Sequence, residues 1–345
     1  MKKPRVLING FGRIGRAITR INLDHDKFEL VAVNDINPDA KNMAYLLKYD
    51  STYGQLARTI EHEPGRLFID GQVVELTHKE NIKDLDLTGI DIVIEATGIK
   101  SNLQEIEKMA YLNLATKYVI TNVDSPTAKN IIFGVNESEL LAHKGNIFSA
   151  SICDAVAMGP VYNIIKKEYG VISGYLVTLH PWLSYQNLLD GSAASWSQPG
   201  DVDSHFALGR AAPQNLIPKS TSAVNALAHV IPEVSEKIGS FSFRVPTPIV
   251  SGAVLTLLLN KDITVENLIA TFKNIQASQR NNIIALTSEP LISADYIKND
   301  FSAIIDTRWI RVKNMNHVEL IYWYDNEWGY SSRVVDLIIR LWENT

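Results

Sequence analysis

The chain has 345 residues, of which 46% are hydrophobic and 21% are charged, a composition typical of a globular protein long enough for two domains. The net charge of −5 argues against a nucleic-acid partner, and no apolar stretch is long enough to span a membrane. The single cysteine, Cys153, excludes a disulfide within the chain and a cysteine-based zinc site, so we expect a cytoplasmic protein without metal, nucleic-acid or membrane partners.

The N-terminal part of the chain reads as alternating buried strands and helices. Residues 5–9 and 28–34 are short apolar runs, and an amphipathic helix is predicted between them, from Arg13 to about Asn22. Strand, helix and strand in this order form a βαβ unit, which implies a parallel sheet. A hairpin with an Asp-Gly turn is predicted next, over 68–74.

Further elements of the same kind follow. We predict strands over 91–96 and 118–121, separated by one helix. Ser101 and Gln104 have the spacing of a capping box, which places the start of that helix at Ser101 and its end near Leu112.

The pattern changes after about residue 150. Strand-like segments are now separated by long connections, with one helix predicted over 265–278; the segments are 171–179, 240–245, 253–260 and 318–324. This order favours an α+β domain around a mixed or antiparallel sheet. Residues 183–212 read as one long loop, and loops of that length are usually functional or disordered.

A glycine-rich motif lies between the first strand and the first helix. Gly10-Phe11-Gly12-Arg13-Ile14-Gly15 is a GxGxxG sequence, whose glycines allow a tight turn and bring the backbone close to a pyrophosphate. An ordinary glycine-rich turn is the alternative. Asp35 ends the second strand, where a carboxylate accepts hydrogen bonds from ribose hydroxyls and repels a 2′-phosphate. The context therefore predicts a site for NAD.

Two further residues are candidates for chemistry. Cys153 precedes a helix predicted from Asp154 to about Lys167, and a helix N-terminus favours the thiolate. The alternative is that Cys153 is a small buried apolar residue. His180 follows the strand segment 175–179, and its local sequence does not separate a catalytic role from a structural one.

Several sequence blocks together resemble phosphorylating glyceraldehyde-3-phosphate dehydrogenase, and the resemblance runs essentially end to end. The blocks are Asn9–Arg16, Tyr49–Thr52, Glu95–Gly98, Phe243–Thr247 and Tyr324–Tyr330. Met43–Asp50 is also similar to the related erythrose-4-phosphate dehydrogenases. The resemblance implies an α/β fold with an NAD-binding Rossmann domain over 1–152, completed by 326–345, and a catalytic domain over 153–325.

The resemblance also implies roles for individual residues. Cys153 matches the family nucleophile and His180 the histidine that activates its thiol. The residues implied to bind NAD are Gly10, Gly12, Arg13, Ile14, Asp35, Thr97, Thr121, Asn326 and Tyr330. Those implied to bind the substrate phosphate or inorganic phosphate are Arg210, Thr221 and Arg244. A homotetramer that acts in glycolysis is implied as well.

The chain departs from the family near these phosphate sites. Ile152 and Asp154 replace the residues on either side of the nucleophile, Leu183 and Tyr185 replace threonines after the histidine, and Ser222 replaces a glycine. Hydroxyl donors are lost, and a carboxylate stands beside the thiol. Asp154 either faces the sulfur and opposes its ionisation, or caps the helix and points away.

The leading hypothesis is NAD-dependent oxidation of glyceraldehyde 3-phosphate, or of a close phosphorylated aldehyde, through a thiohemiacetal and an acyl thioester that phosphate then cleaves. The same oxidation of another aldehyde, such as erythrose 4-phosphate, is one alternative, and water as the acyl acceptor is another. The last is a cofactor-binding protein with weakened catalysis. Retention of Cys153, His180, Asn326 and Arg244 argues against it.

Overall fold

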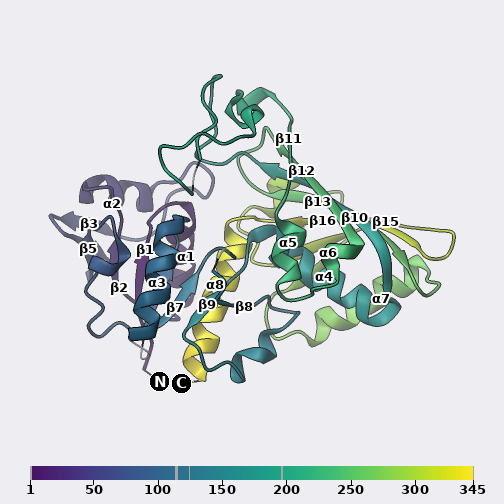
Figure 1. The fold of residues 1–345 in the computed structure, drawn as a ribbon, viewed down its shortest axis with the longest axis horizontal. Helices are drawn as coiled ribbons and strands as arrows, with labels where there is room; N and C mark the ends of the chain where they lie inside the picture. Colours follow the sequence, from purple (N-terminus) through teal and green to yellow (C-terminus); the bar gives the residue numbers. More distant parts are fainter. Residues whose placement is uncertain (1, 113–115, 124, 196, 345) are drawn as a thin grey trace. The chain divides into compact units, whose positions relative to one another are not determined.

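A computed structural model describes residues 2–112, 116–123, 125–195 and 197–344, and it divides the chain into two compact units (Figure 1). The first unit comprises 1–131, 138–150 and 331–345. The second comprises 132–137 and 151–330. Within the described residues, no helix combines the length and the apolar character that crossing a membrane requires.

The first unit is built on a nine-stranded sheet. In sheet order its strands are β3 (Ile60–Glu63), β4 (Arg66–Ile69), β5 (Gln72–Thr77), β2 (Glu29–Asn34), β1 (Arg5–Asn9), β6 (Ile92–Glu95), β7 (Lys117–Ile120), β9 (Ile147–Ser149) and β8 (Lys129–Asn130). From β5 to β8 all neighbours are parallel, whereas β3, β4 and β5 pair antiparallel. The predicted βαβ unit and parallel sheet are confirmed.

Four helices accompany this sheet, namely α1 (Arg13–His25), α2 (Ala40–Lys48), α3 (Lys100–Leu112) and the greater part of α8 (Trp328–Glu343). The end of α8 is tied to the unit by two hydrogen bonds, from Lys117 Nζ to the Leu341 carbonyl and from Trp342 Nε1 to the Lys2 carbonyl. Lys2 and Trp342, which are close to the two ends of the chain, therefore lie side by side in the same unit. Figure 1 marks the two ends.

Two local predictions have different outcomes. The hairpin is confirmed, because Asp70 and Gly71, with φ of 49° and 81°, form the turn between β4 and β5. The capping box at Ser101 is wrong, because α3 begins at Lys100 and Ser101 therefore lies inside its first turn. The turn before α3 uses Thr97 instead, whose hydroxyl accepts hydrogen bonds from Ile99 N and from the side chain of Asn102.

The second unit contains a seven-stranded mixed sheet. Its strands, in sheet order, are β11 (Ile217–Lys219), β12 (Ile238–Val245), β10 (Val171–Pro181), β13 (Ser251–Leu259), β16 (His317–Tyr324), β15 (Ala303–Lys313) and β14 (Ile284–Thr287). The pairs β10–β12 and β14–β15 are parallel, and the other pairs are antiparallel. The α+β fold with a mixed sheet is confirmed, although β11, β14 and β15 were not predicted.

Helices α4 (Cys153–Tyr169), α5 (Ala223–Ala228), α6 (Val234–Lys237) and α7 (Val265–Ser278) gather on one side of this second sheet (Figure 1). The strands bury alternate residues on that side. On β10, Leu176, Thr178 and His180 are buried, while Tyr175 and Leu179 are exposed. Because side chains along a strand alternate between faces, His180 is directed to the covered face.

Candidate active site

The cysteine begins a helix, as the sequence predicts. Cys153 is the first residue of α4, and Ile152 before it is extended. Ser151 has a φ of 59°, in the left-handed region that residues with a Cβ rarely adopt. The carbonyl of Ser151 accepts a hydrogen bond of 3.1 Å from the hydroxyl of Tyr330. The hydrogen bond from Tyr330 holds this strained turn at Ser151 in place. The turn determines where the chain enters α4 and therefore where the sulfur of Cys153 lies.

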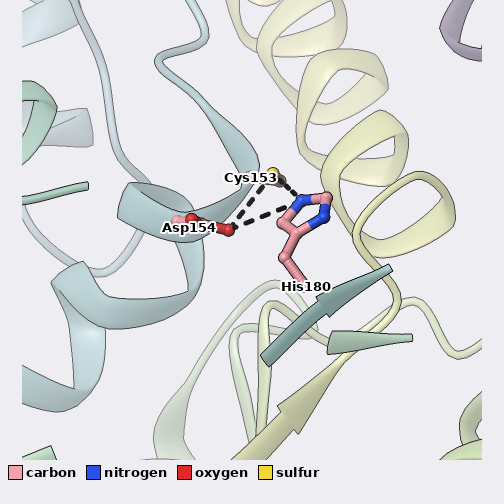
Figure 2. A group of neighbouring side chains, drawn as sticks. All are labelled: Cys153, Asp154 and His180. Atoms are coloured by element: carbon pink, nitrogen blue, oxygen red, sulfur yellow. Dashed lines mark hydrogen bonds and ion pairs between the residues drawn. The ribbon is translucent and has the colours of Figure 1, made fainter. Parts of the chain in front are cut away.

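His180 faces the sulfur with the nitrogen that can accept a proton. Its Nε2 lies 3.7 Å from Cys153 Sγ (Figure 2), and its Nδ1 lies 2.8 Å from the carbonyl oxygen of Pro181. A carbonyl only accepts hydrogen bonds, so Nδ1 must carry the proton of the neutral ring. Nε2 then presents a lone pair to the thiol, which is the arrangement that a general base requires.

Asp154 points toward Cys153 and His180 and forms a cluster with them. Its Oδ1 lies 3.5 Å from Cys153 Sγ and 3.9 Å from His180 Nε2 (Figure 2). Tyr324 donates its hydroxyl to Oδ1 at 2.8 Å, and Thr221 donates its hydroxyl to Oδ2 at 3.2 Å. The alternative in which Asp154 caps the helix and points away from the sulfur is therefore wrong.

Charge and burial set the protonation states of the three residues. Burial alone would raise the pKa of Asp154, but His180, the Tyr324 hydroxyl and Arg244 together lower it, so the carboxylate is ionised. Burial, helped by the charge of Arg244, lowers the pKa of His180 to about 4, so the ring is neutral near pH 7. Burial and then the negative charge of Asp154 raise the pKa of Cys153 well above its ordinary value.

The sequence-based expectation of a thiolate favoured by the helix N-terminus is therefore wrong for the resting site. A helix terminus stabilises an anion by about 0.3–1 kcal/mol at most surface sites. Loss of hydration and a like charge at 3.5 Å from Sγ both outweigh that contribution. The resting pair is a thiol beside a neutral imidazole.

Two of the three residues implied to bind phosphate lie at the cluster, and the third does not. Arg244 is buried on β12, where it is the register partner of His180 on β10, and its Nη1 lies 3.5 Å from the Pro181 carbonyl oxygen. Thr221 is joined to Asp154, as described above. Arg210 is exposed and forms an ion pair with Asp190. Arg244 and Thr221 thus belong to the cluster, whereas no contact in the described part of the chain links Arg210 to it.

The substituted positions offer few replacement donors. The backbone N–H of Leu183 donates to the side chain of Gln186, and Ser222 precedes α5 without a side-chain capping bond. The hydroxyl of Thr221 donates to the Asp154 carboxylate and is thereby engaged. An incoming phosphate would have to compete with Asp154 for this hydroxyl while facing its negative charge.

The glycine-rich turn of the first unit fits a dinucleotide. Gly10 has a φ of 95°, and a Cβ on it would lie 2.7 Å from the Ala96 carbonyl carbon. A Cβ on Gly15 would lie 2.2 Å from the Gly10 carbonyl oxygen, so both positions exclude a side chain. Gly12 is exposed, and a Cβ there would meet nothing within 4 Å. The turn is therefore closely packed beneath an exposed backbone that a pyrophosphate can approach.

Asp35 follows β2 directly, as predicted. Its Oδ2 accepts a hydrogen bond of 2.7 Å from Phe11 N in the glycine-rich turn, and its Oδ1 accepts one of 2.9 Å from Asn37 N. The carboxylate is half-buried and thus remains accessible to further donors. The guanidinium of Arg13 pairs with Asp50 and lies over the ring of Tyr53.

The other residues implied to bind the cofactor are divided between the units. In the first, Ile14 is half-buried on α1, and the hydroxyls of Thr97 and Thr121 both donate to Glu95, through its carboxylate and its carbonyl respectively. In the second, Asn326 and Tyr330 are buried. Asn326 Oδ1 accepts a hydrogen bond of 3.1 Å from Val250 N, which fixes the orientation of its amide.

Sequence reasoning missed two polar residues that organise these sites. Tyr324 was seen only as part of a matching block, and nothing local shows that its hydroxyl reaches Asp154 across 170 positions of sequence. Glu95 is buried at the end of β6 and binds Asn9 and Thr97. The sequence signal that could have identified Glu95 is an acidic residue at the end of an apolar strand.

Fold and site together define a class of protein. A dinucleotide-binding unit accompanies a second unit that carries a cysteine beside a neutral histidine, and this combination defines an oxidoreductase that acts through a thiol. A family model described as the NAD binding domain of glyceraldehyde 3-phosphate dehydrogenase matches residues 4–103. A second, described as the C-terminal domain of the same enzyme, matches residues 152–326.

Similarity to known proteins extends over nearly the whole chain. Glyceraldehyde-3-phosphate dehydrogenase 2 of Caenorhabditis briggsae is 35% identical, and the match covers 98% of both chains. A cytosolic glyceraldehyde-3-phosphate dehydrogenase of Gracilaria gracilis is 34% identical over 99% of both chains. A chloroplastic one of Arabidopsis thaliana is 36% identical over 97% of this chain and 78% of its own. The chain belongs to the glyceraldehyde-3-phosphate dehydrogenase family, and its cofactor is NAD.

The electrostatics of the cluster lead to a prediction for thiol reactivity. Asp154→Asn removes a negative charge beside the sulfur, so the pKa of Cys153 should fall. The rate at which iodoacetamide alkylates Cys153 increases with pH as the thiol ionises. In Asp154→Asn the midpoint of this increase should therefore lie at a lower pH. The measurement is the pH dependence of alkylation, followed by mass spectrometry in the absence of cofactor.

Asp262→Asn, a change at an exposed acidic residue outside the cluster, serves as the control and should leave the profile unchanged. Coincident profiles for Asp154→Asn and the unsubstituted protein would show that the carboxylate does not govern the thiol.

Proposed function

We propose that this protein oxidises glyceraldehyde 3-phosphate, or a close phosphorylated aldehyde, with NAD, and that phosphate then cleaves the resulting acyl thioester. One observation carries the proposal: Cys153 Sγ lies 3.7 Å from an Nε2 whose lone pair is fixed by the bond from Nδ1 to Pro181. A nucleophile beside an oriented base is what thioester chemistry with an aldehyde needs. Oxidation of glyceraldehyde 3-phosphate is the activity named for the relatives.

The residues of the cluster divide the chemistry between them. His180 Nε2 removes the thiol proton as Cys153 Sγ attacks the aldehyde carbon, and the protonated ring then gives this proton to the aldehyde oxygen, which completes the thiohemiacetal. NAD, when bound, supplies the acceptor for the hydride that leaves this carbon. The thiohemiacetal proton returns to Nε2, and Cys153 holds the acyl group as a thioester until an acceptor oxygen attacks it.

The cost of charging this site explains why the thiol need not be ionised at rest. The pKa of His180 is low and that of Cys153 is high, so a thiolate–imidazolium pair is unfavourable at rest. The thiol proton moves to His180 only as Cys153 Sγ attacks the substrate. Once formed, the imidazolium lies 3.9 Å from the Asp154 carboxylate, which stabilises it. Asp154 thus opposes thiolate formation but favours protonation of the base.

We assign Arg244, Thr221 and Arg210 to the phosphate group of the substrate. Arg244 is supported by its burial beside His180 and Thr221 by its contact with the cluster. Arg210 is engaged with Asp190 instead. The positions that match the family's phosphate sites carry the substitutions described above. Two alternatives therefore stay open to test: another aldehyde such as erythrose 4-phosphate as the substrate, and water as the acyl acceptor.

The rate of NADH formation tests this function. With glyceraldehyde 3-phosphate the rate should require inorganic phosphate, with a high KM for inorganic phosphate because the negative charge of Asp154 repels it. Asp154→Thr should lower that KM by about tenfold or more, the effect expected for one charge-assisted hydrogen bond. Asp154→Asn, which removes the charge without adding a hydroxyl, separates the two contributions.

Steady turnover that does not depend on phosphate would favour water as the acceptor. A larger rate with erythrose 4-phosphate would change the assigned substrate, and no NADH with either aldehyde would contradict the proposed function.

For the cofactor we propose contacts with Gly10, Gly12, Arg13, Ile14, Asp35, Thr97, Thr121, Asn326 and Tyr330. The half-buried carboxylate of Asp35, held by Phe11 N, supports the choice of NAD over NADP, because a 2′-phosphate would meet a negative charge. Asp35→Ala should reduce the ratio of kcat/KM for NAD to that for NADP, by about 10-fold or more. Glu61→Ala, at an exposed acid on β3, is the control.

An unchanged ratio in Asp35→Ala, or a preference for NADP in the unsubstituted protein, would contradict this role of the carboxylate.

We also propose a homotetramer that acts in glycolysis in the cytoplasm. Exposed apolar side chains on one face of the second sheet support assembly, namely Tyr175, Leu179 and Phe241 on the neighbouring strands β10 and β12. The cytosolic relative of Gracilaria gracilis supports the location. Sedimentation equilibrium of the full chain should give four times the chain mass, and Phe241→Asp should lower the observed mass; a monomer in the unsubstituted protein would contradict the assembly.

A further inference from the structure

One lysine of the second unit is directed to the same covered face of the sheet as the active-site residues. Lys219 is the last residue of β11, which pairs antiparallel with β12. Lys219 lies opposite Ser242, and Ile217 lies opposite Arg244. Side chains that are opposite each other in an antiparallel pair share a face. Because Ser242 and Arg244 are both buried on the covered face, Lys219 extends from that face as well, one row of side chains away from Arg244.

The ammonium group of Lys219 retains donors for a ligand. Its Nζ donates one hydrogen bond, to the carbonyl oxygen of Ser220, and it forms no ion pair with any carboxylate in the described part of the chain. The hydroxyl of Ser242, in the same row, is bonded to Thr178 and does not hold the ammonium. An ammonium has three N–H donors, so two are left for a ligand. The side chain is only partly buried, so a solute can reach them.

Arg244, in the neighbouring row, is a buried cation with an unused donor. The residue is 7% exposed. Within the described residues its one hydrogen bond runs from Nη1 to the Pro181 carbonyl oxygen at 3.5 Å, which is long, and its Nε–H has no acceptor. Buried polar groups nearly always have partners, and a buried charge is costly without them. The unpaired Nε–H therefore indicates that an acceptor binds beside Arg244.

The charges of the two residues act on each other. Burial and then the positive charge of Arg244 lower the pKa of Lys219, and the carboxylates of Asp154 and Asp203 offset this only in part. Lys219 also contributes, after burial and Arg244, to the low pKa of His180, so its charge is felt at the general base. An anion bound by both cations would offset their repulsion and the water that they have lost.

Phosphate is the anion that fits this pair of cations. A phosphate group carries close to two negative charges near pH 7 and has several acceptor oxygens. Arginine binds phosphate through paired N–H groups, and lysine binds it as a point charge. A carboxylate has one negative charge and would neutralise only one of the two cations. Both phosphorylated aldehydes and inorganic phosphate, the reactants of the proposed function, supply the required group.

We propose that Lys219 is a specificity-determining residue, which binds a phosphate group together with Arg244. The group is either the phosphate of the aldehyde or inorganic phosphate, and the chemistry of recognition is the same for both. No covalent bond changes: the ammonium contributes hydrogen-bond donors and a positive charge that opposes the repulsion by Asp154. The inference rests on the proposed function for the identity of the ligand, but binding of phosphate itself needs neither aldehyde nor NAD.

Binding of inorganic phosphate to the full chain, without aldehyde or NAD, is measured by isothermal titration calorimetry. Lys219→Met keeps the length of the side chain but removes its charge, so the affinity should fall by about tenfold or more, as expected for loss of one charge-assisted hydrogen bond. Lys219→Arg should retain most of the affinity. Lys273→Met, at an exposed lysine of α7, is the control and should bind as the unsubstituted protein does. Circular dichroism verifies that each variant is folded.

Equal phosphate affinity in Lys219→Met and the unsubstituted protein, or no phosphate binding by the unsubstituted protein, would overturn the proposal. The same change in the background of Asp154→Asn separates a ligand contact from a counterion. If Lys219 contacts phosphate, Lys219→Met should weaken phosphate binding whether residue 154 is charged or not. A lysine that only balances the Asp154 carboxylate would lose its effect in Asp154→Asn, and that result would overturn the proposal as well.

Steady-state kinetics at saturating NAD identifies which phosphate group Lys219 binds. For the phosphate of the aldehyde, Lys219→Met should lower kcat/KM for glyceraldehyde 3-phosphate by about tenfold or more and leave that for unphosphorylated glyceraldehyde unchanged. For inorganic phosphate, the variant should instead raise the KM for phosphate and affect both aldehydes alike. Either result supports the site. An equal loss of rate with both aldehydes, at an unchanged KM for phosphate, would show a structural role and overturn it. Weaker phosphate binding by Lys219→Met, in a protein that oxidises no aldehyde, would support the site and contradict the proposed function.

Discussion

The burial of one ionised carboxylate, that of Asp154, is the constraint on which the catalytic unit depends. A buried charge costs several kcal/mol unless hydrogen bonds and an opposite charge offset the loss of water. The compensating groups come from separate elements: Tyr324 ends β16, Thr221 precedes α5, and Arg244 lies on β12 beside His180. The mixed sheet must therefore bring β16, β10 and β12 under the start of α4 before this side chain can be accommodated.

That constraint determines how the thiol is controlled. A helix N-terminus and a neighbouring histidine would ordinarily favour a thiolate–imidazolium pair. Here the carboxylate and burial hold Cys153 as a thiol, and Arg244 and burial keep His180 neutral. The pair is therefore less reactive at rest, and its charges develop only with substrate. The same carboxylate then lies close enough to stabilise the imidazolium.

The sequence predicted most of what is local and little of what is distant. Apolar runs and the glycine-rich turn predicted β1, α1 and β2, and alternation predicted β10, β12, β13 and β16, because the period of the side chains reflects the face that is buried. Strands β3, β8, β9, β11, β14 and β15 were not predicted, and neither was the true start of α3. The side chain of Tyr324 could not be placed, since its role depends on strands paired across the fold. The direction of Asp154 was left open for the same reason: its position in sequence suits a helix cap and a partner of the thiol equally well.

One substitution next to the nucleophile therefore acts on both the thiol and an incoming phosphate. A carboxylate at this position raises the pKa of Cys153, repels phosphate and engages the hydroxyl of Thr221. A neutral hydroxyl would do the reverse, because it carries no charge and donates to phosphate oxygens. Reactivity of the thiol and affinity for phosphate are thus linked through the charge at residue 154. The positive charge of Arg244 acts in the opposite direction on both, because it favours the thiolate and attracts the anion.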